Sequence, residues 1–288
     1  MFSWVRRIAL LLIAMTTTAA AAQTVLWPPV GEPATAARVA GRWLWADLAT
    51  TDVARSSDFY ARVFGWTYRT VPGHAGDPAY VTIVAGGQPI GGIVPARTDK
   101  TSSGSRWIGL VSGDPKSTAA RAQERGGSIV VAPRTLPGRG EFTVLSDPSG
   151  ARFAVLRADR GDPPDQLGRE GEWLWAELWT SDPERAVAFY RDVFGYAVSA
   201  AGKSARDSYV LHAGGRARAG VMRSPDAALK PVWIPYVRVS DVKATVARAE
   251  KNGALVIVAP RAHHRSQVAV LVDPLGAPFA VADWASSR

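Results

Sequence analysis

The sequence predicts an α+β protein built from two similar domains, and three observations support this prediction. The stretch Gly41–Trp66 returns as Gly171–Tyr196 at an offset of 130 residues, with 14 of 26 positions identical. DPSGARFAV (Asp147–Val155) returns as DPLGAPFAV (Asp273–Val281). Each copy also orders its patterns as a strand, a helix and further strands. A period this long indicates a duplicated domain, since solenoid repeats span roughly 20–50 residues.

The first 22 residues have the layout of a secretory signal peptide. Arg6 and Arg7 precede the apolar run Ile8–Met15, and small residues follow up to Ala22. The run is shorter than the ~20 residues of a membrane-spanning helix. We expect cleavage near Ala22, a periplasmic or secreted product, and no stable membrane insertion afterwards; a signal anchor is the alternative. The chain has no cysteine, so its stability would come from packing without disulfides.

The remaining chain divides by composition into two domains and two connecting segments. Residues 23–40 form a lead-in, and residues 41–157 form the first domain. The linker, 158–170, is rich in proline, glycine and charge, and residues 171–284 form the second domain. A tandem chain can supply internally the contacts that single-copy proteins obtain by dimerising, so we expect a monomer.

Each domain is expected to contain two units of one strand, one helix and three strands (βαβββ). In the first unit the alternating stretch WLWADLAT from Trp43 predicts a strand, and Asp52 predicts the N-cap of a helix over 53–64 that Gly65 ends. Strands are predicted at 79–85 and 89–95. The cycle restarts with a strand at 106–111, a helix over 114–125, and strands at 128–132, 141–145 and 151–156.

Charge and motifs narrow the classes of function. The 34 lysines and arginines outnumber the 25 aspartates and glutamates, but they are scattered along the chain. Since no basic run follows the spacing of a phosphate backbone, we expect no nucleic-acid partner. Phosphate-binding glycine loops and recognised nucleophile motifs are also missing from the sequence.

The pattern FY-xx-VFG followed by DPxG resembles the vicinal oxygen chelate superfamily, which includes glyoxalase I, bleomycin-resistance proteins and extradiol dioxygenases. The resemblance covers roughly residues 40–157 and 171–284. It implies that two βαβββ units per domain form a curled mixed sheet with the helices outside. It also implies that the metal enzymes of this superfamily place one His, Glu or Gln from each of four strands on the concave face.

The metal positions implied by the resemblance hold no metal ligands in this chain. They fall at Trp45 and Trp175, at Trp107 and near Ile234, at Ala154 and Ala280, and within 91–94 and 219–222. Indole and alkyl groups do not bind the metals that need imidazole or oxygen donors. The four histidines, His74, His212, His263 and His264, have no recognised ligand spacing. We therefore expect no metal and no other cofactor.

Aromatic residues and one acid per domain are the candidate ligand-binding groups. Strand alternation places every second side chain on one face, so Trp43, Trp45 and Asp47 are expected to face the cup together. An aromatic pocket with a carboxylate suits a small, flat or cationic organic molecule. The predicted residues are Trp43, Trp45, Asp47, Trp107, Trp173, Trp175, Glu177, Trp233 and Tyr236.

Three other interpretations remain open at the sequence level. The aromatic side chains can simply fill the cup, with Asp47 and Glu177 paired to an arginine such as Arg152. Alternatively the protein is a lyase, isomerase or dioxygenase that works with a metal at a non-standard site or with the two acids as bases. The filled cups would also suit a structural or interaction module in which the two cups are paired and their pockets closed. The DPxG segments are interpreted as turns and the Phe-Tyr pairs, at 59–60 and 189–190, as helix core.

Overall fold

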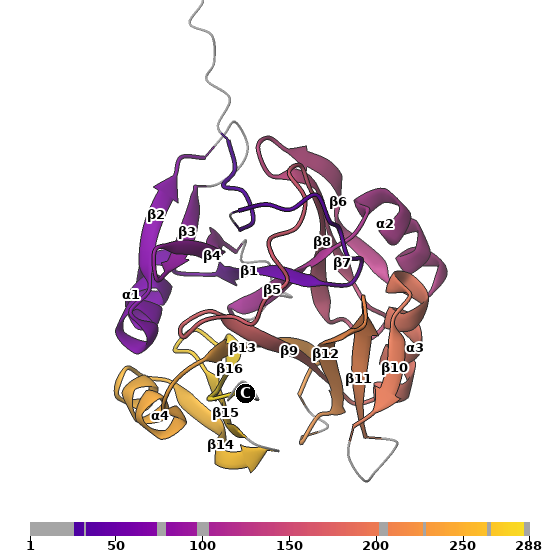
Figure 1. The fold of residues 1–288 in the computed structure, drawn as a ribbon. Coiled ribbons are helices and arrows are strands. Elements are labelled where there is room, and N and C mark those ends of the chain that lie inside the picture. The colour runs from indigo at the N-terminus through magenta and orange to yellow at the C-terminus, as the bar shows by residue number, and fades with distance from the viewer. Residues whose placement is uncertain are drawn as a thin grey trace, which may run out of the picture.

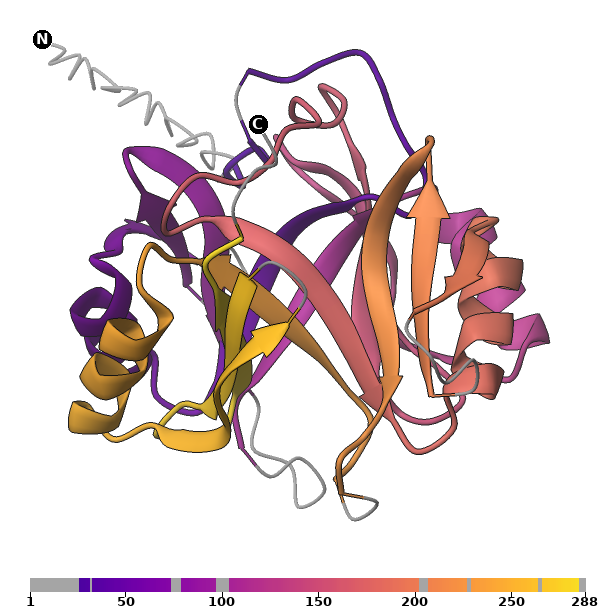
Figure 2. The same ribbon diagram turned by 60° about the horizontal axis from the view of Figure 1, so that its bottom comes forward.

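Two curled sheets with helices on their outer sides make up the molecule (Figures 1 and 2), which confirms the predicted α+β fold of two domains. The computed structural model describes residues 26–31, 33–73, 79–96, 104–201, 207–226, 229–263 and 266–284. In these ranges no helix is long and apolar enough to cross a membrane. The predicted signal peptide lies outside the described residues.

The first domain contains the eight strands β1 to β8 and two helices. In chain order its elements are β1 (Trp43–Thr50), α1 (Val53–Phe64), β2 (Thr67–Val71), β3 (Tyr80–Ala85), β4 (Gln88–Pro95), β5 (Arg106–Ser112), α2 (Pro115–Glu124), β6 (Ser128–Leu136), β7 (Gly140–Ser146) and β8 (Arg152–Ala158). The strand order is β2-β3-β4-β1-β5-β8-β7-β6. Strand β1 runs antiparallel to β5, and this pairing joins the two βαβββ units into one sheet.

The second domain repeats this topology. Its elements are β9 (Trp173–Thr180), α3 (Pro183–Phe194), β10 (Ala197–Ala200), β11 (Ser208–Ala213), β12 (Arg216–Arg223), β13 (Val232–Arg238), α4 (Val242–Lys251), β14 (Leu255–His263), β15 (Ser266–Val272) and β16 (Pro278–Ala282). The strand order is β10-β11-β12-β9-β13-β16-β15-β14. The concave faces of the two sheets are called cup 1 and cup 2.

The ends of α1 confirm the predicted signals. The Asp52 side chain accepts a hydrogen bond from the Arg55 backbone N–H at 2.9 Å, and Gly65 ends the helix with a φ of 73°. The left-handed conformation is one that glycine adopts without a Cβ clash. Within the first domain, β2 is the element for which the sequence pattern predicted no position.

The helix-bearing faces of the two sheets, which lie on the side away from the cups, pack against each other. One core cluster joins Phe59 and Tyr60 of α1 to Val246 of α4 and Phe279 of β16. A second joins the other two units in the equivalent way, and α1 contacts α4 while α2 contacts α3. Each βαβββ unit therefore buries its helix side against a unit of the other domain.

Candidate functional site

Cup 1 holds a compact polar cluster on its concave face. Strand β1 places Trp45 and Asp47 there, and Tyr80 reaches them from β3. The Tyr80 hydroxyl donates to Asp47 Oδ1 at 2.6 Å, and Trp45 Nε1 donates to the same oxygen at 2.9 Å. Burial raises the pKa of Asp47 above its usual value, while Arg139, Tyr80 and Trp45 oppose that shift.

Arg139 fills the space in front of this acid. Its guanidinium lies 5.4, 5.1 and 4.8 Å from the ring centroids of Trp27, Trp45 and Tyr80, and its side chain is 1% exposed. Nη1 is 3.9 Å from Asp47 Oδ2, and Nε donates to the Pro28 carbonyl at 2.7 Å. Cup 1 thus encloses a cation of its own chain in an aromatic cage, beneath the lead-in segment.

For Asp47, this pairing bears out the alternative in which the acid pairs with an arginine of its own chain, but the arginine is not Arg152. Asp47 pairs with Arg139 from the hairpin between β6 and β7, and Arg152 lies at a different site described below. Sequence alternation cannot identify Arg139, because a hairpin-tip side chain reaches into the cup from its rim.

Cup 2 carries a related cluster whose acid has no ion-pair partner among the described residues, although the charge of Arg261 on β14 reaches Tyr236 and opposes the rise that burial causes in the pKa of Tyr236. Glu177 Oε2 accepts hydrogen bonds from Tyr236 OH at 2.8 Å and from Trp179 Nε1 at 3.0 Å. Trp175 lies beside the acid, and the partly exposed Trp284 packs against Trp175 with ring centroids 6.2 Å apart. No arginine, lysine or histidine in the described ranges forms an ion pair with Glu177, which is itself half-buried.

A glycine makes room for each acid. A Cβ at Gly92 would lie 2.6 Å from Asp47 Oδ1 and 1.9 Å from the Tyr80 hydroxyl. At Gly220 it would lie 3.0 Å from Glu177 Oε1 and 3.3 Å from Trp175 Nε1. Both cups are therefore shaped at the backbone level around a carboxylate.

Trp43 and Trp173 do not share a face with Trp45 and Trp175, contrary to the expectation from alternation. The pairing with β5 shifts register between Trp43 and Trp45, as a β-bulge does. The same shift occurs in β9, because Trp173 and Trp175 pair with the consecutive residues Val237 and Tyr236 of β13. Because the extra residue reverses the side-chain phase, both tryptophans join the interdomain core, where Trp173 packs 5.1 Å from Trp107.

Trp107 and Trp233 also lie outside the cups. Trp107 pairs with Leu48 and Trp233 with Leu178, so both share the helix-facing side of their sheets. The cup face of β13 instead presents Ile234 and Tyr236.

The repeated FY and DPxG motifs contact each other across the domains. Trp107 Nε1 donates to Tyr60 OH at 2.9 Å, and Tyr60 OH donates to Asp273 Oδ2 at 3.1 Å. Trp233, Tyr190 and Asp147 form the equivalent chain at 2.9 and 3.2 Å. The motifs interpreted from sequence as turn and helix core are thus the two halves of one interdomain lock.

Comparison with known proteins identifies the family. Residues 42–155 match the Glyoxalase/Bleomycin resistance protein/Dioxygenase superfamily, and residues 175–282 match the Glyoxalase-like domain. The anthracycline biosynthesis protein DauV of Streptomyces sp. (strain C5) is 31% identical over an alignment of 253 residues, and the match covers 83% of this chain and 92% of DauV. The chain belongs to the glyoxalase/bleomycin resistance protein/dioxygenase superfamily.

Solved structures of the superfamily share the fold at low sequence identity. The Mn(II)-bound glyoxalase from Novosphingobium aromaticivorans has a TM-score of 0.59 at 18% identity, covering 85% of this chain and 83% of the other. The 2,2′,3-trihydroxybiphenyl 1,2-dioxygenase of Sphingomonas wittichii has a TM-score of 0.59 at 15% identity, covering 84% and 90%. At these identities the comparison shows a shared fold and nothing about function.

The residues present do not fit a superfamily metal. On the concave face Trp45 lies opposite Leu110, which pairs with Ala154, while Trp175 lies opposite Tyr236, which pairs with Ala280. In the described ranges no three His, Cys, Asp or Glu side chains come together as metal ligands would. Indole, phenol and alkyl groups in these positions leave each cup one carboxylate.

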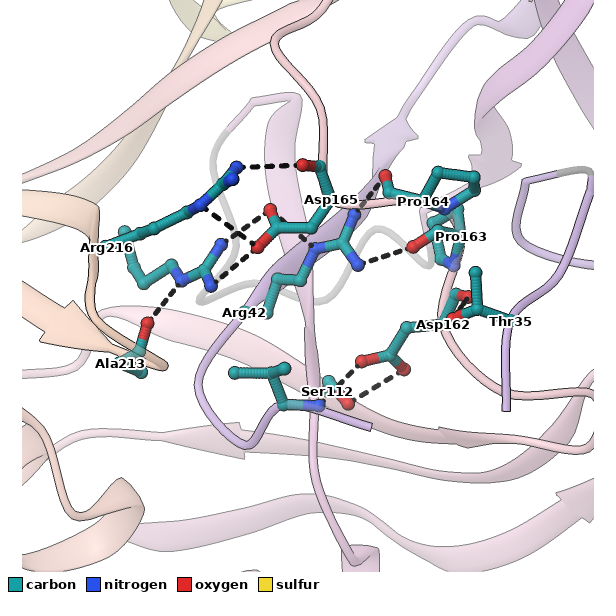
Figure 3. A network of polar contacts seen from close by, with 11 residues as sticks. Thr35, Arg42, Ser112, Asp162, Pro163, Pro164, Asp165, Ala213 and Arg216 are labelled. Carbon is teal, nitrogen blue, oxygen red and sulfur yellow. Dashed lines mark hydrogen bonds and ion pairs between the residues drawn. The ribbon is translucent and has the colours of Figure 1, made fainter. Parts of the chain in front are cut away.

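A cavity of about 460 Å³ lies between the domains under the linker, and the WLW stretches of both copies line it, including the four tryptophans at positions 43, 45, 173 and 175. Its wall is tied to the linker by arginines (Figure 3). Arg42 donates to the Pro163 and Pro164 carbonyls, and Arg218 forms a bidentate pair with Asp165 at 2.8 and 2.9 Å. These contacts hold the linker against both superfamily domains.

Besides Arg139 and Trp27, three cup residues had no prediction from the sequence, although two of them carried a signal. Trp179 follows Trp175 and Glu177 at the same alternation, and Tyr80 opens a strand that the sequence predicts. Trp284 lies beyond the last strand, where no pattern indicated a contact. The nine predicted residues fall into four places: cup 1, cup 2 and two interdomain cavities.

Proposed function

We propose that the protein binds a small organic cation with a flat conjugated group in cup 2, without a metal. The observation that carries this proposal is the difference between the cups: Asp47 has Arg139 in its aromatic cage, and Glu177 has no cation partner among the described residues. The mature protein would act after export, which rests on the composition of residues 1–22.

The group that occupies cup 1 indicates what kind of ligand cup 2 would bind. Its guanidinium is planar, contacts three aromatic faces and lies near a buried carboxylate. A planar cation gains from both interactions, since aromatic faces and carboxylates each attract it. Cup 2 offers the same groups in the form of Trp175, Glu177 and Tyr236.

Cup 2 is also the more accessible of the two. Trp45 and Asp47 are 1% and 9% exposed, whereas Trp175 and Glu177 are half-buried and Trp284 is 45% exposed. The relation to DauV, whose name places it in the biosynthesis of anthracyclines, supports a flat conjugated ligand. A carboxylate acting as a base on substrate is less well supported in cup 1, because Arg139 stands in front of Asp47.

The test compares three matched probes by calorimetry: benzamidine, a planar cation; benzamide, its neutral isostere; and benzoate, an anion. We expect saturable binding of benzamidine and at least about tenfold weaker binding of benzamide. Glu177→Gln removes the charge that selects the cation and should weaken benzamidine binding by about tenfold or more. Trp175→Leu should weaken it as well, through loss of the aromatic face.

Two controls make the result decisive. Glu141→Gln removes one negative charge on the exposed β7–β8 surface, where Glu141 faces Arg157, and should leave benzamidine binding unchanged. Arg265 directly precedes β15 as Arg139 directly precedes β7, and it lies outside the described residues. Benzamidine binding that appears only in Arg265→Ala, or no saturable binding in any variant, would overturn the proposal.

A further inference from the structure

The structure contains a second candidate binding site, at the opposite side of the domain interface from the linker. A cavity of about 240 Å³ lies over Trp107 of β5 and Trp233 of β13, which are equivalent residues of the two domains. Gly150 and Gly276, the last residues of the two DPxG turns, form part of its wall. This space is called the twofold cavity.

Its charges are all of one sign among the described residues that line it. Arg106, Arg152 and Lys230 border the cavity, and no aspartate or glutamate that the structure describes does. The neighbouring turn acids point elsewhere, because Asp147 Oδ1 accepts the Ser149 and Ala151 N–H groups and Oδ2 accepts Tyr190 OH. Clustered charges of one sign beside a low-dielectric wall focus the field on the space between them.

The part of the wall that the second domain supplies is apolar apart from Lys230. Arg106 and Arg152 come from the first domain, while the equivalent residues of the second domain are Val232 and Pro278, with Pro231 beside them. The cavity therefore combines a cationic side, an apolar side and the edges of two indoles. This combination fits a small molecule with an anionic group on an apolar or aromatic body.

We propose that the twofold cavity binds a small organic monoanion, in particular an aromatic carboxylate. The arginine guanidinium matches a carboxylate with paired N–H donors, and the lysine adds a point charge. The volume lies below the roughly 300–1,000 Å³ of pockets for drug-sized ligands, which favours a single-ring acid. This site is independent of the cation site in cup 2.

The experiment measures benzoate binding to the full-length chain by calorimetry, with benzamide as the neutral isostere. We expect saturable benzoate binding that weakens with added salt, and no comparable binding of benzamide. The double variant Arg152→Gln/Lys230→Gln should weaken benzoate binding by about tenfold or more. Arg157→Gln, which changes an exposed arginine on the same strand five residues after Arg152, should not.

The outcomes separate this proposal from the proposed function. Benzoate binding should persist in Glu177→Gln, which weakens binding at the cation site, and benzamidine should not compete with benzoate. Absence of saturable benzoate binding, or an equal loss in Arg157→Gln and the double variant, would overturn the twofold cavity as an anion site. Matching circular dichroism and thermal unfolding of all variants would show that the loss is not a loss of fold.

Discussion

At the scale of single residues, the decisive pair is Asp47 with Arg139. Both are almost fully buried, and both hydrogen-bond to Tyr80: the phenol donates to the acid, and Arg139 Nη2 donates to the phenol oxygen at 3.1 Å. A buried ion pair contributes little net stability compared with a well-packed apolar set, but removing one partner leaves an uncompensated charge. Arg139 is therefore held in cup 1, because its removal would leave Asp47 buried without a cation.

Arg139→Met should reduce the free energy of unfolding by roughly 3–5 kcal/mol, because Asp47 stays buried without its cation. Urea unfolding measures this change. Arg157→Met, at an exposed arginine whose side chain is 55% accessible, is the control and should change stability by at most about 0.5 kcal/mol. Equal effects of the two variants would show that the buried pair has no special role.

The stability of Arg139→Met should depend on pH in a definite direction. Burial raises the pKa of Asp47 in the folded protein, and Arg139 is the largest opposing influence, so its loss raises that pKa further. The folded state then binds a proton more tightly than the unfolded state, and stability is gained as pH falls through the folded pKa. The stability difference between Arg139→Met and the natural chain should narrow at mildly acidic pH; a constant difference in urea titrations would contradict this account.

At the scale of elements, the strand-to-helix repeat was predictable, whereas the faces of Trp43 and Trp173 were not. Asp52, Gly65 and the apolar spacing of Phe59 and Val63 are local signals, and they set α1 without reference to the rest of the chain. The bulge at Leu44 depends on pairing with β5, so alternation alone assigned Trp43 to the wrong face. Arg139 was missed for a similar reason, since its partner Asp47 is distant in sequence.

The interdomain lock explains why the FY motif contacts a DPxG motif of the other domain. Tyr60→Phe removes the hydroxyl that joins Trp107 Nε1 to Asp273 Oδ2 and leaves both groups buried without that partner. We expect a loss of roughly 1–3 kcal/mol in the free energy of unfolding, measured in urea.

Tyr68→Phe is the matched control for the lock. The Tyr68 hydroxyl is buried and has no hydrogen-bond partner among the described residues, so its removal relieves an unsatisfied polar group. We expect Tyr68→Phe to be neutral or stabilising. If Tyr60→Phe were equally harmless, the repeated motif would act through packing alone.

At the scale of the whole molecule, the two domains do not have separate cores. Phe59 and Tyr60 pack against Phe279 of the other domain, and Phe153 packs against Phe189 and Tyr190 in the equivalent place. Trp66 Nε1 donates to the Gly171 carbonyl at 2.8 Å, and Tyr196 OH donates to the Gly41 carbonyl. Each domain thus completes the apolar face of the other, while the cups remain on the outside.

This arrangement predicts that neither half is a stable monomer when expressed alone. A chain of residues 23–158 would expose the side of its sheet that carries Trp107 and Phe153, so it should form dimers or aggregates in size-exclusion chromatography with light scattering. Co-expressed with residues 159–284, it should form a one-to-one complex, because the paired Tyr and Asp partners then meet as in the intact chain. The intact chain carrying Asp165→Ala is the control: loss of the linker's pair with Arg218 should leave it monomeric. A monomeric first half that unfolds cooperatively at the temperature of the intact protein would show that the interdomain core is dispensable and that each cup is an independent folding unit.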